Sequence, residues 1–71
     1  MKIEEARELK PGDKVMCVEL QAYALDAIDT LFEWEVVAVF GGPNVRVLMH
    51  DGGEGQQLVM YHNIASKVGA V

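Results

Sequence analysis

Residues 33–62 read EWEVVAVFGGPNVRVLMHDGGEGQQLVMYH, and the clearest β-strand signals of the chain lie here. It contains three runs rich in β-branched and aromatic side chains, at 33–40, 45–50 and 56–62. The segments GGPN and DGGEG separate these runs, and their glycine, proline and asparagine residues are strong turn signals. The pattern therefore predicts three consecutive antiparallel strands joined by two turns.

The residues before this stretch predict a short helix and one more strand. Ile3, Ala6 and Leu9 are spaced three apart, which is typical of one or two helical turns. The Pro-Gly-Asp segment that follows ends the helix, because proline disfavours helix in the residue before it. Residues 14–20 are short and β-rich, so we expect a strand there. Residues 21–31 contain three alanines and no glycine or proline, and we interpret them as a long loop with a helical turn.

The residues after the stretch complete a small all-β pattern. Asn63 is a good helix cap, so residues 63–66 are predicted to form a helical turn. Residues 67–71 are predicted to return as a brief last strand. The expected fold class is mainly β, with about five strands in a single domain that covers residues 1–71.

Composition excludes several classes of protein. The chain has 71 residues, a formal charge of -5 and 51% hydrophobic residues, so it is too apolar for a disordered acidic tail. One cysteine cannot form an internal disulfide, and two histidines are too few for a structural zinc site of the usual kind. The acidic balance opposes generic binding to nucleic-acid phosphates. With no apolar targeting segment in view, we expect a cytoplasmic protein without membrane contact.

Turn lengths predict how the three strands pair. A loop over 51–55 pairs strand 45–50 with strand 56–62, so that His50 faces Gln56, Leu48 faces Leu58 and Arg46 faces Met60. A loop over 41–44 gives the other predicted pairs, which are Phe40–Val45, Ala38–Val47, Val36–Met49 and Trp34–Asp51.

Alternation along the strands then divides the side chains between two faces. The predicted core face holds Trp34, Val36, Ala38, Phe40, Val45, Val47, Met49, Val59 and Tyr61. The opposite face holds polar residues and an unexpected apolar cluster around one arginine. The cluster and its arginine are the predicted partner-binding residues, which are Val37, Val39, Arg46, Leu48, Leu58 and Met60. Such a cluster indicates either a region covered by another segment or a contact surface for a protein or a second copy.

Acidic residues concentrate in one part of the chain, at Asp26, Asp29, Glu33 and Glu35. Runs of this kind are usually solvated, and the alternative is a contact for a basic partner.

Candidate catalytic and metal-binding residues do not converge. The predicted pairing places His50 and His62 on the order of 20 Å apart, at about 3.3 Å per residue, so we expect no metal site. His50 is instead expected to pair with Glu35 on the neighbouring strand. Cys17 is expected to be a buried, inert thiol, because no basic neighbour is placed to activate it. We expect no catalytic residues and no cofactor.

Three aromatic residues, Tyr23, Phe32 and Trp34, could frame an aromatic pocket at one end of the sheet. Trp34 is more often a core residue in such a pattern. Stacking on a nucleic acid would also require a positive groove, and Lys14, Arg46 and Lys67 are too sparse to form one.

Three segments resemble the strands of an SH3-like barrel, and within that group the Tudor-type modules. They are Leu9-Lys10-Pro11-Gly12-Asp13-Lys14-Val15, Trp34-Glu35-Val36-Val37-Ala38-Val39 and Val45-Arg46-Val47-Leu48-Met49-His50-Asp51-Gly52. The resemblance implies a small barrel used for binding. It departs from methyl-lysine readers at Gly52, where those modules usually carry an aromatic residue.

The function expected from these observations is a non-catalytic protein-interaction module, self-associating through the apolar sheet face. Two alternatives stay open. One is an acidic inhibitor or adaptor of a mobile element that binds a basic partner. The other is a nucleic-acid-binding small barrel.

Overall fold

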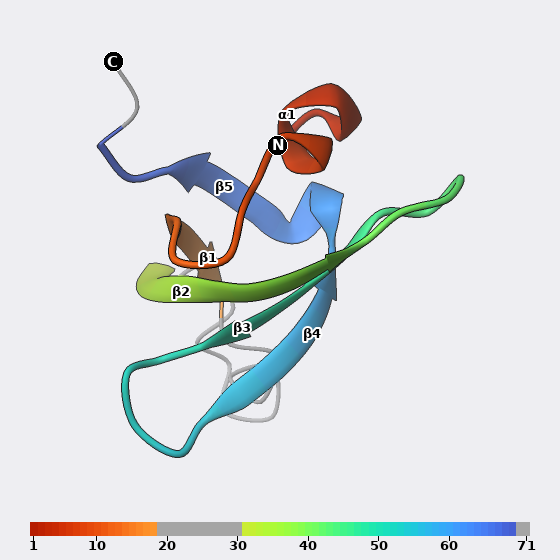
Figure 1. The fold of residues 1–71 in the computed structure, drawn as a ribbon. Coiled ribbons are helices and arrows are strands. Elements are labelled where there is room, and N and C mark those ends of the chain that lie inside the picture. Colours follow the sequence, from red (N-terminus) through yellow and green to blue (C-terminus); the bar gives the residue numbers. More distant parts are fainter. Residues whose placement is uncertain (19–30, 70–71) are drawn as a thin grey trace.

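The structure is a computed structural model, and it describes residues 1–18 and 31–69. Figure 1 shows a bent antiparallel sheet with one short helix above it. The elements, in chain order, are α1 (Ile3–Arg7), β1 (Lys14–Val18), β2 (Leu31–Phe40), β3 (Arg46–His50), β4 (Gln56–Met60), the 3-10 helix η2 (Tyr61–Asn63) and β5 (Ile64–Lys67).

The sheet has five strands in the order β4-β3-β2-β1-β5. This order places β4 and β5 at the two edges of the sheet. All neighbouring strands pair antiparallel. This arrangement confirms the predicted fold class, which is mainly β with a short N-terminal helix and a helical turn before the last strand. Long β2 lies at the centre because it pairs with β1 along one part of its length and with β3 along another.

Several element boundaries differ from the prediction. The helical turn lies at η2, two residues earlier than expected, and β5 therefore begins at Ile64. Ile64 is fully buried and pairs with Cys17 in β1, and this burial holds the last strand against the sheet. The first helix ends at Arg7 and not at Leu9. The loop predicted over 21–31 lies outside the described residues, except that Leu31 already belongs to β2.

Both turns of the central meander contain a glycine with positive φ. Gly42 has φ of 106° and Gly52 has φ of 92°, conformations that other residues adopt only at a cost. The Asp51 backbone N–H donates to the Gly55 carbonyl and closes the second turn. The glycines that the sequence uses as turn signals are therefore required by the backbone at these two positions.

The register between β3 and β4 agrees with the prediction, and the register between β2 and β3 does not. His50 faces Gln56, Leu48 faces Leu58 and Arg46 faces Met60, as expected. Between β2 and β3, the predicted pair Val36–Met49 is present, but the register shifts by one residue after it. The observed pairs beyond the shift are Ala38–Leu48, Val39–Val47 and Phe40–Arg46.

This shift is a β-bulge at Val37, which adds one residue to β2 and exchanges the faces of the residues beyond it. Ala38 and Phe40 lie on the face opposite the core, so their predicted core positions are wrong. Val39 packs against the core cluster, so its predicted place among the partner-binding residues is wrong as well. Val37 belongs to the bulge and pairs with no residue of β3 in the observed register.

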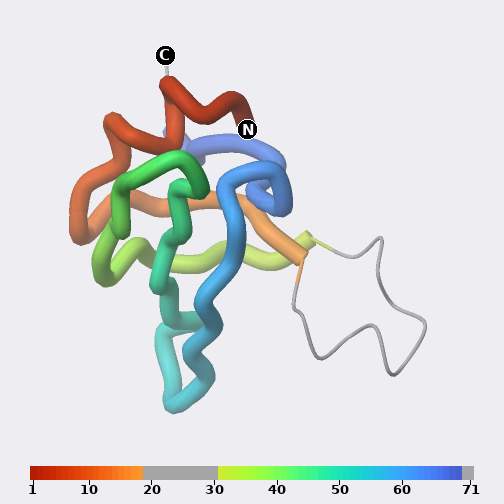
Figure 2. Tube along the Cα trace, turned by 90° about the vertical axis from the view of Figure 1, so that its right-hand side faces the viewer, coloured from red at the N-terminus to blue at the C-terminus, as the bar shows by residue number. Residues whose placement is uncertain are grey.

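The core lies on the concave side of the sheet. Its main cluster contains Leu9, Val15, Cys17, Trp34, Val36, Val47, Met49, Val59 and Ile64. Trp34 is 3% exposed, and its indole N–H donates to the Cys17 carbonyl at 3.1 Å. Figure 2 shows how the chain winds around this core, with the N-terminal segment close to the last strand. Tyr61, a predicted core-face residue, lies in η2 and is only partly buried.

Candidate interaction surface on the outer sheet face

The convex side of strands β2, β3 and β4 carries the candidate interaction surface. Directly paired residues of antiparallel strands place their side chains on the same face, so the observed register defines two rows. We call these rows together the outer face, and its residues are Ala38, Leu48 and Leu58 in one row and Phe40, Arg46 and Met60 in the next.

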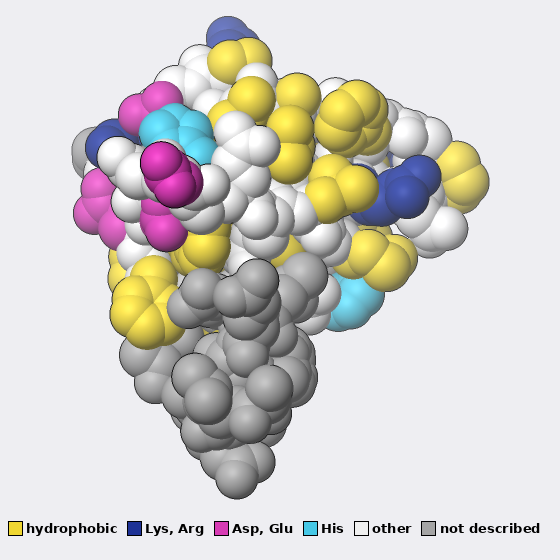
Figure 3. All heavy atoms as spheres, turned by 90° about the horizontal axis from the view of Figure 1, so that it is seen from below, with side chains coloured by type: hydrophobic (Ala, Val, Ile, Leu, Met, Phe, Trp, Pro, Cys, Tyr) yellow, Lys and Arg dark blue, Asp and Glu magenta, His cyan; other side chains and the backbone are white. Residues whose placement is uncertain are grey.

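The outer face presents large apolar side chains to solvent. Phe40 is 50% exposed and Leu58 is 43% exposed, while Leu48 and Met60 are partly buried. Figure 3 shows hydrophobic side chains gathered around a basic one on this side of the molecule. Isolated exposed apolar residues are normal on a protein surface, but a contiguous group around an arginine is typical of an interface.

Arg46 is exposed at the centre of its row, between Phe40 and Met60. No ion pair or side-chain hydrogen bond joins it to any residue of the described ranges 1–18 and 31–69. Its guanidinium group is therefore available to a carboxylate from outside these residues. Arginine is favoured over lysine at interfaces because it binds carboxylates with two parallel hydrogen bonds.

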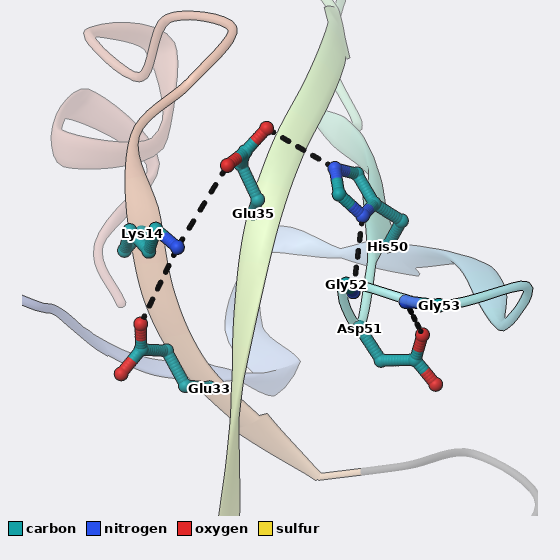
Figure 4. Close-up of polar contacts among 7 residues, drawn as sticks. All are labelled: Lys14, Glu33, Glu35, His50, Asp51, Gly52 and Gly53. Carbon is teal, nitrogen blue, oxygen red and sulfur yellow. Dashed lines mark hydrogen bonds and ion pairs between the residues drawn. The ribbon is translucent and has the colours of Figure 1, made fainter.

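A polar network borders the outer face, because Glu35, His50 and Gln56 form the row of pairs next to Ala38, Leu48 and Leu58. Figure 4 shows the contacts of this network. Glu35 lies between Lys14 and His50, with its Oε1 3.8 Å from the Lys14 Nζ and its Oε2 3.1 Å from the His50 Nε2. The same Lys14 ammonium group lies 3.7 Å from Glu33 Oε1. The predicted pair between His50 and Glu35 is confirmed.

The backbone fixes the orientation of the His50 ring. The Gly52 N–H donates to His50 Nδ1 at 3.1 Å, so Nδ1 is an acceptor and the neutral ring carries its proton on Nε2, facing Glu35. In the turn that follows, the Gly53 N–H donates to the Asp51 carboxylate at 2.8 Å. The His50 imidazole therefore links Glu35 of β2 to Gly52 in the turn that follows β3.

A hollow of about 170 Å³ lies beside this network, lined by Lys14, Glu33, Trp34, Glu35, His50, Asp51 and Gly52. Its lining residues include no serine, threonine or cysteine, so His50 has no nucleophile beside it there. Residues 1–18 and 31–69 also contain no group of three or more His, Cys, Asp or Glu side chains that could hold a metal ion.

Two of the four residues of the predicted acidic contact, Glu33 and Glu35, lie among the described residues. Glu33 and Glu35 both pair with Lys14, which reduces the negative charge that they offer to a basic partner. Asp26 and Asp29 lie outside the described residues. Lys67, another of the sparse basic residues, lies 3.6 Å from the Asp13 carboxylate.

Of the three aromatic residues of the predicted pocket, the structure describes two, Phe32 and Trp34. Trp34 is a core residue, as the sequence favoured, and only Phe32 is well exposed, at 43%. Tyr23 lies outside the described residues.

Cys17 is buried, as predicted, and burial raises the pKa of its thiol from 9.0 to about 11. The thiol donates to the Asn63 carbonyl at 3.3 Å, which ties β1 to η2. Gln57 connects the same region from β4, because its side-chain amide donates to the Val18 carbonyl at 2.9 Å. A thiol with a raised pKa is a poor nucleophile at neutral pH, so Cys17 acts as a structural residue.

No family model, curated protein or solved structure matches the chain. Among the described residues, the helices are too short to cross a bilayer. The candidate function therefore depends on the geometry of the outer face.

Proposed function

We propose that the chain is a non-catalytic protein-interaction module that associates with a second copy of itself at the outer face. One observation carries this proposal. Phe40 and Leu58 are exposed on the same sheet face as Arg46, whose guanidinium group has no partner among the described residues. Burying the half-exposed Leu58 side chain against a partner would contribute about 1 kcal/mol.

Charge distribution supports a protein contact over a nucleic-acid contact. Lys14 and Lys67 are both ion-paired with carboxylates, and Arg46 alone contributes positive charge to the outer face. Nucleic-acid affinity depends on several unpaired Lys and Arg side chains along one surface. A gel shift at low ionic strength tests this reasoning, and we expect no retarded complex.

The strand order also supports the SH3-like architecture that the sequence resembles. The meander β2-β3-β4, the 3-10 turn and a last strand that pairs with β1 follow the expected sequence of elements. Small barrels of this type use sheet surfaces and loops for binding.

Sedimentation velocity across a wide range of concentration tests the proposal. We expect the wild-type chain to form a dimer and Leu58→Lys to be folded and monomeric. Val68→Lys is the matched control, because Val68 is an exposed apolar residue (38%) that follows β5 and lies outside the outer face. A wild-type chain that stays monomeric at every concentration contradicts the proposal, as does a dimer that Leu58→Lys leaves intact.

A further inference from the structure

The two edges of the sheet differ in how well they are protected from pairing with another strand. At the β5 edge, the register with β1 shifts between Met16 and Cys17, and the strand ends in Lys67. A bulge and a lysine are both common devices that prevent an edge strand from adding another strand. The β5 edge is therefore protected.

The β4 edge has none of these devices. Its sequence, QQLVM, contains no charge and no proline, and it pairs with β3 over five consecutive residues without a shift. Of the residues that the structure describes, only those of β3 form a strand pair with β4. Leu58, in the middle of this edge, is 43% exposed. An uncharged, regular edge strand with exposed apolar residues is a template for a further strand.

The hydrogen-bond pattern shows which backbone groups point outward from this edge. The Asp51 N–H donates to Gly55, and the Tyr61 N–H donates to Val45, so these two pairs are hydrogen-bonded. Bonded and non-bonded pairs alternate in an antiparallel ladder. The pairs between them that involve Gln56, Leu58 and Met60 are therefore non-bonded, and these three residues direct their N–H and C=O groups away from β3.

We infer that β4 pairs antiparallel with β4 of a second copy, with Leu58 opposite Leu58 of that copy. This inference rests on the proposed self-association and assigns its geometry. In this register Gln56 faces Met60 of the second copy, and the three outward-pointing residues all fall in bonded pairs. The Leu58 pair would contribute two backbone hydrogen bonds and each Gln56–Met60 pair one, because the Met60 carbonyl caps η2, so about four backbone hydrogen bonds would join the copies. The rows of apolar residues on the two outer faces would meet at the two Leu58 side chains.

Charge complementarity favours a second copy as the occupant of this edge. The chain is acidic, yet β3 (RVLMH) and β4 (QQLVM) contain no carboxylate, so two copies can approach along β4 without repulsion between acids. Glu54 precedes β4, and Arg46 faces Met60 at the other end of that strand. Antiparallel pairing would bring Glu54 of each copy toward the unpartnered Arg46 of the other.

Disulfide trapping tests the register. Gln56→Cys and Met60→Cys are prepared as separate proteins, mixed in equal amounts and oxidised mildly. Bonded antiparallel residues lie about 5.5 Å apart at their Cα atoms, which is within reach of a disulfide. We expect the mixed disulfide to exceed either homodimer by about tenfold, whereas a random encounter gives only about a twofold excess because the mixed pair can form in two ways. Buried Cys17 stays unreactive, and Gln56→Cys mixed with Val68→Cys is the control for random encounter.

A charge exchange tests the contact between the strand ends. Arg46→Glu or Glu54→Lys alone places like charges together at both ends of the paired strands, so each variant should dimerise about tenfold more weakly than wild type. A mixture of the two variants places opposite charges together at both ends, and we expect it to dimerise within about threefold of wild type. Failure of the mixture to recover contradicts the inferred orientation.

Phe40→Lys separates this inference from the broader proposal. Phe40 lies two strands away from the β4 edge, so edge pairing predicts that Phe40→Lys weakens the dimer much less than Leu58→Lys does. If the two outer faces instead pack against each other, Phe40→Lys is monomeric and the mixed disulfide is absent, and the inferred pairing is wrong while the self-association stands. A monomeric wild-type chain refutes both.

Discussion

The bulge at Val37 predicts that substitutions at two adjacent residues of β2 differ in their effect on stability. Val39 pairs with fully buried Val47 and packs against the core, whereas Phe40 pairs with Arg46 and is 50% exposed. Lysine placed at each position in turn should therefore have different effects on stability. Without the bulge, the two effects would be exchanged, because alternation along the strand would turn Val39 outward.

The magnitudes follow from burial. Val39→Lys loses the apolar contacts of a partly buried valine and brings an ammonium group toward the core, which we expect to cost about 3 kcal/mol. Phe40→Lys loses about half of the burial of a phenylalanine side chain, or about 1 kcal/mol, and the lysine stem replaces part of the contact. A chain of 71 residues has a total free energy of unfolding of about 4 to 11 kcal/mol. Val39→Lys should therefore be close to unfolded or strongly destabilised.

Thermal unfolding followed by the fluorescence of Trp34, the one tryptophan in the chain, measures the difference. At about 4 to 8 °C per kcal/mol, Val39→Lys should lower Tm by at least about 12 °C and Phe40→Lys by about 4 to 8 °C. All variants are compared at one low protein concentration, because association would add to the apparent stability. Equal losses, or a larger loss for Phe40→Lys, would refute the bulged register.

Three further predictions concern the turn, the tryptophan and the thiol. Gly55→Ala would place its Cβ against the Asp51 carboxylate, so urea unfolding should show a loss of about 1 kcal/mol that disappears in an Asp51→Ala background. Trp34→Phe removes the hydrogen bond to the Cys17 carbonyl and some core volume, and denaturant titration followed by circular dichroism should show a loss of about 2 kcal/mol. The pKa of Cys17 is raised from 9.0 to about 11, so the folded protein keeps a proton that the unfolded chain loses. The free energy of unfolding should therefore fall between about pH 9 and pH 11, by about 2 kcal/mol, and Cys17→Ala should remove this slope.

The elements of the fold were largely predictable because their signals are local. The turn segments, two of whose glycines adopt positive φ, fix where β2, β3 and β4 begin and end to within two residues. The loop over 51–55 also gave the correct register between β3 and β4, because its length leaves one consistent pairing. The helical turn and β5 were displaced in the prediction, since the position of β5 depends on burying Ile64 beside a strand far away in the sequence.

The candidate surface was predictable only in part. Arg46, Leu48, Leu58 and Met60 lie on the outer face as expected, because the register that places them comes from one short turn. Phe40 was missed and Val39 was included wrongly, and both errors come from the bulge. A signal was present in the uninterrupted apolar run VVAV at residues 36–39, which lacks the alternation that would fix a register.

A small, mainly β chain with an excess of apolar residues and an arginine among them follows from local sequence signals. Which of these apolar residues face outward depends on tertiary contacts. In the run 36–39 every residue is compatible with the core, so local preference cannot select one face. Strand pairing selects the outward-facing residues. The first part of β2 pairs with β1 and the second part pairs with β3. The extra residue in β2 opposite β3 turns Phe40 to the surface.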